Sequence, residues 1–391
     1  MQKWATSSQE SGAAQIAFMN PGGLRKDMVG TGTDAFPRTL TYKQAAVVQP
    51  FASTLFNIDM TGAQIETVLE QQWQRTSTGA VPSRPFLKLG VSDGFTYTYT
   101  ETPVEVQGTA TYAGEVTGMW LDGVAIDPAA TYSVTVNSFL VTGGDNFFEF
   151  ANGANRADTG KADLQAMVDY MAAMASSTPL PVDYAQTAVE VSFPEGAPAS
   201  YAPGDSVAFD LGSLAMAGPG DQTDSSVDVY LGDDLLGTAP VDNTLGSDVY
   251  DYYGTASVDV ALPSDAPVGE TALTVVGATT GTEVTVPITV EAEAVPLAKI
   301  ARKNFKIKPS TLEAHTIWKM KIMITATPDV TVAGKVQVKI GKTTYSAKIK
   351  SGEGVIKQLP KMKKGPKDFT VRFLGSDTVR ATSKTVTLKF K

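Results

Sequence analysis

The residues best suited to chemistry lie in one short stretch, from Phe139 to Asp145, where an aromatic ring, two adjacent glycines and an acid follow one another. Gly143 and Gly144 reach positive φ without steric cost, so a ligand can approach the main chain closely. An aromatic ring stacks on flat groups, and a carboxylate accepts hydrogen bonds from hydroxyls. The stretch therefore suggests a binding site for a flat polar ligand. The alternative is an ordinary hairpin turn with Phe139 in the core.

Strands must position this stretch. Apolar and polar residues alternate from Tyr132 to Asn137, a period of two that predicts a strand with one buried face. Ile16–Met19 is a short apolar run typical of a buried strand, and it stops at a Pro- and Gly-containing turn over residues 20–25, which ends with the basic Arg25. Two further strands are predicted over Leu87–Val91 and Phe95–Tyr99.

Three helices are predicted around these strands. Thr41 with Gln44 forms a possible capping box for a short helix, and Thr61 with Gln64 opens a longer one. The last helix has one apolar stripe, which is typical of a core face. Its members are Leu164, Met167, Val168 and Met171.

The histidine and cysteine counts exclude several kinds of chemistry. The 391 residues include no cysteine, which excludes disulfides, thiolate metal sites and a cysteine nucleophile. The single histidine, His315, lies in the basic third block, so a site with two metals bound by several histidines is excluded and a Ser-His-Asp triad is disfavoured. The Asp221/Asp224 group and the Asp233-Asp234 pair lack EF-hand spacing and are predicted to be solvated loops.

Charge divides the chain into three blocks. Residues 1–185 carry 10 Lys+Arg and 18 Asp+Glu, residues 186–297 carry 0 and 18, and residues 298–391 carry 22 and 5. Because the three blocks differ in their balance of basic and acidic residues, we expect three domains. No apolar run approaches the length of about 18 residues that a membrane span needs, and the first ten residues lack the apolar core of a signal peptide.

The second and third blocks have the pattern of β-sandwiches. A Pro- and Ser-containing linker over residues 176–187 ends the helical periodicity. Beyond it, short alternating runs are separated by Gly, Pro and Asp clusters. These runs are Val189–Phe193, Val227–Leu231, Val258–Leu262, Val336–Ile340 and Val386–Phe390.

Four motifs, in order along the first block, resemble the C-terminal domain of the 5′-nucleotidases. They read NPGGLR at 20–25, VVQPF at 47–51, IDMTGAQIETVLEQQW at 58–73 and NSFLVTGGDNF at 137–147. The resemblance covers about residues 1–180. In that family this domain binds the nucleoside part of the substrate, while a separate N-terminal metallophosphoesterase domain holds two metals and hydrolyses the phosphate ester.

The resemblance implies a role for each matching residue. Phe51 and Phe139 would sandwich the base, and Asp145 would accept hydrogen bonds from the ribose hydroxyls. The other implied contacts are Gly143 and Gly144 along the main chain, Arg25 on the phosphate, Asn20 on the base and Gly94 lining the base pocket. Many members have Asn two positions after the first stacking Phe, whereas this chain has Ser53, so no base preference is implied.

The implied fold class is a multidomain chain. An α+β 5′-nucleotidase C-terminal-like domain over residues 1–180 is followed by an acidic β-sandwich over 188–292 and a basic one over 298–391. Both all-β sandwiches resemble bacterial immunoglobulin-like modules. The family's domain begins with an arginine-bearing helix upstream of Met1, so we expect residues 1–180 to be truncated at the N-terminus and a metallophosphoesterase domain and signal peptide to be encoded upstream.

The expected function is the nucleotide-binding part of a secreted or surface-attached bacterial 5′-nucleotidase-like phosphohydrolase. The alternative is a non-catalytic surface or envelope-binding protein. We expect no cofactor in this chain, with divalent metals only in the preceding catalytic domain. The expected partners are a nucleotide or nucleoside and, through residues 298–391 with their net charge of +17, an anionic cell-envelope polymer or nucleic acid. The alternatives for the basic block are a solvated lysine surface or docking against the acidic middle domain.

Overall fold

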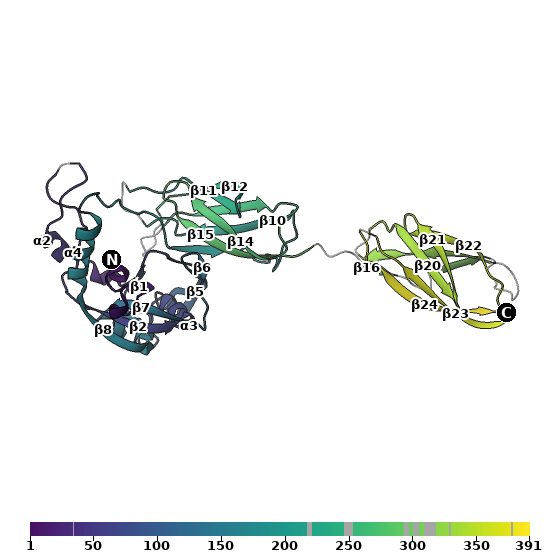
Figure 1. Ribbon diagram of the computed structural model, residues 1–391, viewed down its shortest axis with the longest axis horizontal. Helices are drawn as coiled ribbons and strands as arrows, with labels where there is room; N and C mark the ends of the chain where they lie inside the picture. Colours follow the sequence, from purple (N-terminus) through teal and green to yellow (C-terminus); the bar gives the residue numbers. More distant parts are fainter. Residues whose placement is uncertain are drawn as a thin grey trace. The chain divides into compact units, whose positions relative to one another are not determined.

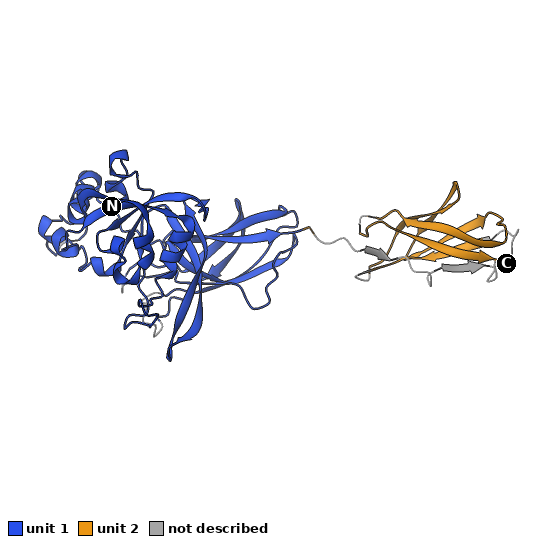
Figure 2. Ribbon diagram, turned by 90° about the horizontal axis from the view of Figure 1, so that it is seen from below, with its two compact units in different colours: residues 1–291 blue, residues 292–391 orange. Residues whose placement is uncertain are grey.

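The computed structural model describes residues 1–33, 35–216, 221–245, 253–292, 297–299, 305–308, 318–327, 330–376 and 378–391, and only the backbone of 297–299, 305–308, 318 and 327. The chain forms two compact units, residues 1–291 and residues 292–391 (Figure 2). His315 lies outside the described residues.

The first sheet of unit 1 has five strands in the order β3-β1-β7-β2-β8 (Figure 1). These are β1 (Ile16–Met19), β2 (Thr54–Thr61), β3 (Gly90–Val91), β7 (Thr131–Asn137) and β8 (Ala154–Ala162). β1 and β7 are adjacent and parallel, whereas the other neighbouring pairs are antiparallel. The carboxyl ends of β1 and β7 therefore meet at one edge of the sheet, and the chain segments after Met19 and after Asn137 start close together.

Short helices connect and cover these strands. The α-helices are α1 (Gln2–Ala5), α2 (Tyr42–Val48), α3 (Gly62–Glu70) and α4 (Asp163–Met174). The 3-10 turns are η1 (Gln9–Ser11), η2 (Pro21–Gly23), η3 (Leu140–Thr142), η4 (Gly144–Asn146) and η5 (Phe148–Asn152). Both predicted capping boxes are present, at Thr41 and at Thr61, each satisfying main-chain N–H groups that a helix start leaves without partners.

The strand β7 is buried on both faces in its second half, so the prediction of a single buried face is wrong there. Val134 and Val136 point into the main core, and Thr135 on the opposite face is also fully buried. The Thr135 hydroxyl lies 2.7 Å from that of Thr6, which directly follows α1. Residues after α1 therefore cover the second face of the strand, which alternation along one strand cannot reveal.

The strand predicted over Leu87–Val91 is reduced to Gly90–Val91 in the structure. Gln72 forms the hydrogen bonds that a neighbouring strand would otherwise make with Leu87 and Leu89. The main-chain oxygen of Gln72 accepts a hydrogen bond from the Leu87 N–H at 2.9 Å, and its side-chain Oε1 accepts one from the Leu89 N–H at 2.7 Å. Only Gly90 and Val91 then pair with β1. The strand predicted to begin at Phe95 is confirmed and extends further than predicted.

The second sheet of unit 1 runs from the first sequence block into the second. Its order is β13-β10-β9-β4-β5-β6, and the pairing of β4 with β9 is parallel. The strands are β4 (Phe95–Val106), β5 (Thr109–Leu121), β6 (Val124–Ala125), β9 (Ala188–Ser192), β10 (Ser206–Gly212) and β13 (Ala256–Ala261). Residues on either side of the predicted linker thus share one sheet within one compact unit. The domain boundary near residue 180 stays a prediction.

A third sheet completes a sandwich in the acidic block. Its order is β12-β11-β14-β15, formed by β11 (Ser226–Leu231), β12 (Asp234–Pro240), β14 (Gly269–Gly277) and β15 (Glu283–Val290). Val229 of this sheet and Val207 of the second sheet belong to the same fully buried core. The sandwich pattern is present, and its immunoglobulin-like identity stays a prediction.

One predicted solvated acid in this block is buried. Asp224 is 1% exposed, and its carboxylate accepts hydrogen bonds from the main-chain N–H groups of Thr279 and Thr280 and from the Thr280 hydroxyl. It therefore anchors the turn between β14 and β15, because an ionised carboxylate satisfies several donors at once. Asp233 and Asp234 are exposed, as predicted.

Unit 2 is formed by strands around its own core. They are β16 (Leu297–Lys299), β17 (Phe305–Lys308), β18 (Trp318–Met323), β19 (Thr325–Thr327), β20 (Gly334–Ile340), β21 (Thr343–Ile349), β22 (Glu353–Leu359), β23 (Gly365–Phe373) and β24 (Thr382–Phe390). A four-stranded sheet in the order β21-β20-β23-β24 buries Val336, Val338 and Phe369 against Ile322 of β18. Among the described residues of the whole chain, no helix has the length and hydropathy to cross a membrane.

Candidate binding site

The loop after β7 presents an aromatic ring at the surface. The Asn137 side-chain oxygen accepts hydrogen bonds from the N–H groups of Phe139 and Leu140, at 3.1 and 2.9 Å, and this turns the chain away from the sheet. Leu140 is then fully buried, whereas Phe139 is 47% exposed. The alternative of Phe139 as a core residue is therefore wrong.

Gly144 lies directly against the ring of Phe139. A Cβ at Gly144 would lie 2.6 Å from the ring carbons Cε1 and Cζ, so any side chain there would displace the ring. Gly143, at φ 83°, provides the left-handed turn that brings the main chain back beneath the ring. The two glycines thus fix where the exposed ring lies.

Asp145 follows in a left-handed conformation of its own, at φ 52°. Its Oδ2 accepts a hydrogen bond of 2.9 Å from the Asn20 Nδ2, and the Asn20 Oδ1 accepts one of 3.0 Å from the Asn137 Nδ2. Asn20 and Asn137 are both almost fully buried. A carboxylate offers about four acceptor directions, so Asp145 retains capacity to accept hydrogen bonds from a ligand.

The chain links Asn20 to Asp145 because their strands end side by side. Asn20 directly follows β1 and Asn137 is the last residue of the parallel neighbour β7. Asn137 was not among the predicted site residues. The signal for it was present, since a polar residue at the end of an apolar strand, just before a Gly-rich turn, is often placed there to cap the turn.

Glutamines of the α3 region hold the other side of the loop. The fully buried Gln74 accepts a hydrogen bond of 2.8 Å from the Asn146 Nδ2, and Gln71 accepts one of 3.2 Å from the Glu149 N–H. Asn146 also has a positive φ, of 60°. Two successive residues thus have left-handed backbone conformations. Asp145 is held by its hydrogen bond with Asn20, and Asn146 by its hydrogen bond with Gln74.

We expect the Asn146→Ala variant to lower the free energy of unfolding by about 1–3 kcal/mol. Alanine is strained at this φ, and the buried amide oxygen of Gln74 loses its donor. Asn146→Gly loses the hydrogen bond and avoids the strain, so it should lose less stability than the alanine variant. Urea unfolding of the three proteins measures this. Equal stability of the alanine and glycine variants would contradict a strained position.

Arg25 and Phe51 form a second group of predicted site residues. The Arg25 N–H donates to the Val48 main-chain oxygen at 2.9 Å, which ties the end of the η2 turn to α2. The guanidinium carbon lies 6.0 Å from the centroid of the Phe51 ring, at the outer limit of a cation–π contact. Phe51 is 62% exposed. A cation and an exposed aromatic ring therefore lie together.

The two groups meet at Gly22. The Arg25 Nη1 donates to the Gly22 oxygen at 3.3 Å, and a Cβ at Gly22 would lie 3.6 Å from the Asp145 Oδ2. Arg25 also lines a cavity of about 600 Å³ with Lys26 and Gln49. Gln49 is 2% exposed, and its Oε1 has no partner among the described residues.

Ser53 and Gly94 lie directly before strands of two different sheets, β2 and β4. The Ser53 main-chain oxygen accepts a hydrogen bond of 2.8 Å from the Asp163 N–H at the start of α4, and burial raises the pKa of the Asp163 carboxyl. Gly94, at φ 84°, forms the turn before β4 and accepts a hydrogen bond from the Asp122 N–H at 2.7 Å.

Gly94 lies at the opposite end of β1 from Asn20. Its turn is tied to Ala17 by the hydrogen bond from the Ser92 N–H, and three residues of strand span about 10 Å. Gly90 instead pairs with Met19, the residue directly before Asn20. The described contacts therefore bring Gly90 to the site edge and leave Gly94 apart, although its role in a pocket stays a prediction.

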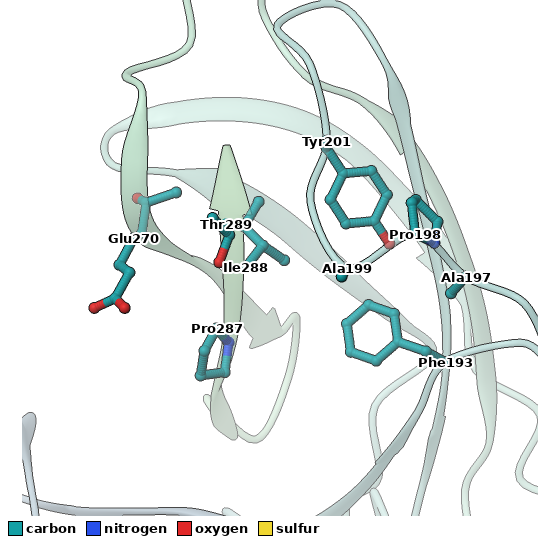
Figure 3. A pocket seen from close by; sticks show the side chains of 10 residues that line it. Phe193, Ala197, Pro198, Ala199, Tyr201, Glu270, Pro287, Ile288 and Thr289 are labelled. Carbon is teal, nitrogen blue, oxygen red and sulfur yellow. The ribbon is translucent and has the colours of Figure 1, made fainter. Parts of the chain in front are cut away.

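The arrangement combines side chains that suit the binding of a ligand. Within the described ranges, no group of three or more His, Cys, Asp or Glu side chains could hold a metal ion, so the residues present do not fit a two-metal centre. A cavity of about 420 Å³ in the acidic sandwich, between Phe193 and Pro287, contains none of the predicted site residues (Figure 3). Exposed rings, an acceptor carboxylate and an arginine are together suited to a flat, hydroxylated and anionic ligand.

Comparison with known proteins places a family match over this region. Residues 1–152 match the family described as 5′-nucleotidase, C-terminal domain. The cell wall protein Lmo0130 of Listeria monocytogenes is 31% identical over 156 residues, which are 40% of this chain and 18% of that protein.

Two further relatives match this chain over a similar length. The trifunctional nucleotide phosphoesterase protein YfkN of Bacillus subtilis is 28% identical over 166 residues, 42% of this chain and 10% of its own length. Protein UshA of Escherichia coli is 26% identical over 181 residues, 46% of this chain and 28% of its own. The chain thus spans less than a third of the length of each of these relatives.

Proposed function

Residues 1–152 belong to the family of 5′-nucleotidase C-terminal domains, and from this premise we propose that they bind the nucleoside part of a nucleotide. The observation that carries the proposal is the exposed Phe139 ring lying on Gly144, next to the Asp145 carboxylate. In this proposal the ring stacks on the base, and Asp145 accepts hydrogen bonds from the ribose hydroxyls. Calorimetric titration of the purified chain with adenosine tests it.

Arg25 extends the proposed site toward the phosphate. A guanidinium binds phosphate through paired donors, and its N–H groups here face the turn beside Asp145. Phe51 forms the second aromatic wall, and Asn20, Ser53, Gly94 and Gly143 are the remaining proposed contacts. AMP should therefore bind more tightly than adenosine, and Arg25→Gln should remove the difference between the two ligands.

We expect the purified chain to release no phosphate from AMP when divalent metal is added. Two-metal hydrolysis needs several histidine and carboxylate ligands, and the sequence has one histidine and no cysteine. In this proposal hydrolysis belongs to a metallophosphoesterase domain outside these 391 residues. A phosphate-release assay with Mn²⁺ or Zn²⁺ measures it. Metal-dependent activity that survives further purification and falls in the Asp145→Asn variant would overturn the expectation.

We also propose that the chain acts at the bacterial cell surface or in the secreted fraction. A relative named as a cell wall protein supports this location. The two sandwiches, proposed to be immunoglobulin-like, then act as spacers, and the basic block over residues 298–391 adheres to anionic polymer of the envelope. This block carries 22 Lys+Arg against 5 Asp+Glu. The alternative function, a non-catalytic envelope-binding protein, predicts the same adhesion without nucleoside binding.

A further inference from the structure

The outer face of the four-stranded sheet in unit 2 concentrates positive charge. Alternation along β20 buries Val336 and Val338, so the residues between and beside them face outward. The cross-strand register then sets which residues share that face. Five cations lie on it, and the four that occupy neighbouring positions are called here the cationic cluster: Lys335 and Lys339 of β20, Lys348 of β21 and Arg372 of β23. The fifth, Lys389 of β24, lies opposite Pro366, toward the other end of the sheet.

The register brings these four charges close to one another. Lys335 lies directly opposite Lys348, and Arg372 lies opposite Gln337, which is between Lys335 and Lys339 on β20. Residues directly opposite have Cβ atoms about 4.5–5.5 Å apart, and diagonal neighbours about 7–8 Å. Each cation of the cluster thus has another as a direct or diagonal neighbour. Like charges directly opposite each other, as Lys335 and Lys348 are, destabilise a sheet.

The two acidic residues of unit 2 that the structure describes, Glu353 and Asp368, do not neutralise this cluster. In the part of the chain that the structure describes, the recorded ion pair joins Lys321 and Glu353 at 2.5 Å, on β18 and β22 of another sheet. Asp368 shares the outer face, but it accepts a hydrogen bond of 2.6 Å from the Thr387 hydroxyl and lies toward the far end of β23 from Arg372. With respect to the described residues, the charge of the cluster is thus available to an external anion.

The remaining side chains on this face indicate the kind of anion. They are mostly hydroxyls and amides: Gln337, Thr344, Ser346, Thr370, Ser383, Thr385 and Thr387. The aromatic Tyr345 lies opposite Val338 and so belongs to the inner face. Cores of protein interfaces are enriched in aromatic residues and depleted of Lys and Ser, and proteins that bind single-stranded nucleic acid stack bases on aromatic rings. A flexible polyanion with a hydroxylated backbone fits this face better than either.

We propose that the cationic cluster binds a polyol-phosphate polymer of the cell envelope, with lysines as point charges and Arg372 as a paired donor to phosphate oxygens. The inference rests on the proposed location of the chain and assigns the adhesive surface of residues 298–391 to one sheet face. Neighbouring hydroxyl and amide groups donate hydrogen bonds to the polymer. A bound polyanion offsets the repulsion between the clustered cations, so their proximity favours binding.

The test uses the whole chain and a synthetic poly(glycerol phosphate) as the probe. We expect the triple variant Lys335→Gln, Lys348→Gln, Arg372→Gln to lower its affinity about tenfold or more at about 50 mM salt, and to flatten the dependence of log K on log salt by about 2. The control triple variant Lys357→Gln, Lys361→Gln, Lys363→Gln changes the charge equally at exposed positions outside the face. It should lose less than threefold.

Three results would overturn the proposal: equal losses in both triple variants, no loss in the face variant, or tenfold tighter binding of single-stranded DNA than of the polymer. The last would assign the face to nucleic acid. Adenosine titration of the same variants should be unchanged. Loss of polymer binding with adenosine binding intact therefore separates the two proposals, and a chain that binds polymer but not adenosine would refute only the nucleoside site.

Discussion

Replacing Asp145 by Asn should lower the affinity of the chain for adenosine by roughly 10- to 150-fold. A hydrogen bond to an ionised acceptor contributes about 1.5–3 kcal/mol, and the amide that replaces the carboxylate has no charge. Asparagine tolerates the left-handed φ of 52°, and its Oδ1 still accepts the hydrogen bond from Asn20. The fold should therefore survive, and isothermal titration calorimetry measures the loss.

Asp158→Asn is the control for this variant. Asp158 is exposed on β8, accepts a hydrogen bond of 2.8 Å from the Gly160 N–H, and is not among the proposed site residues. Its substitution should leave adenosine affinity within a factor of two. 2′,3′-Dideoxyadenosine should bind the unmodified chain and the Asp145→Asn variant equally, because it lacks the hydroxyls that donate to the carboxylate. A tenfold loss for this ligand as well would remove Asp145 from ribose recognition.

Phe139→Ala should lower nucleoside affinity by about 1–3 kcal/mol, the value of one lost base stack. The loss should be similar for adenosine, guanosine and uridine, since every base offers a π-face. Because the ring is 47% exposed, its removal should change the unfolding free energy little. Fluorescence or calorimetric titration with the three nucleosides measures the effect, and Phe139→Trp should retain binding.

Phe193→Ala is the control for ring removal. Phe193 is 40% exposed and lines the cavity of the acidic sandwich, so its loss should not change nucleoside affinity. Phe51→Ala gives a second test: if Phe51 and Phe139 stack on opposite faces of one base, the double variant should lose less than the sum of the single losses. Full nucleoside affinity in Phe139→Ala would place the pocket elsewhere and favour the non-catalytic surface protein.

Local patterns were sufficient for much of the secondary structure. Two capping boxes, at Thr41 and Thr61, predicted the starts of α2 and α3, because the side chain and main chain that make each box are only three residues apart. Alternation predicted β11, β20 and β24, whose buried faces follow a period of two. The family match over residues 1–152 was likewise predicted from four short motifs.

Long-range contacts account for the differences. Gln72 ends the strand predicted from Leu87 through hydrogen bonds to residues 15 and 17 positions away, and Asp224 is buried by a turn more than 50 residues downstream. The pairing of β4 with β9 places the predicted first and second domains in one sheet. Such contacts cannot be predicted from the hydrophobic pattern of the segments they join. That pattern shows which face of one strand or helix is buried, but not which distant residue it contacts.

By itself, the sequence determined which residue types lie between Phe139 and Asp145. Its single histidine and its lack of cysteine also excluded a two-metal site bound by several histidines and any thiolate metal site. The tertiary structure decided that Phe139 is exposed, that Asn137 and Asn20 form a chain of hydrogen bonds to Asp145, and that Gly94 lies apart from them. The physical reason is the parallel pairing of β1 with β7. It joins residues about 120 positions apart at one sheet edge, and only the folded arrangement of strands sets that register.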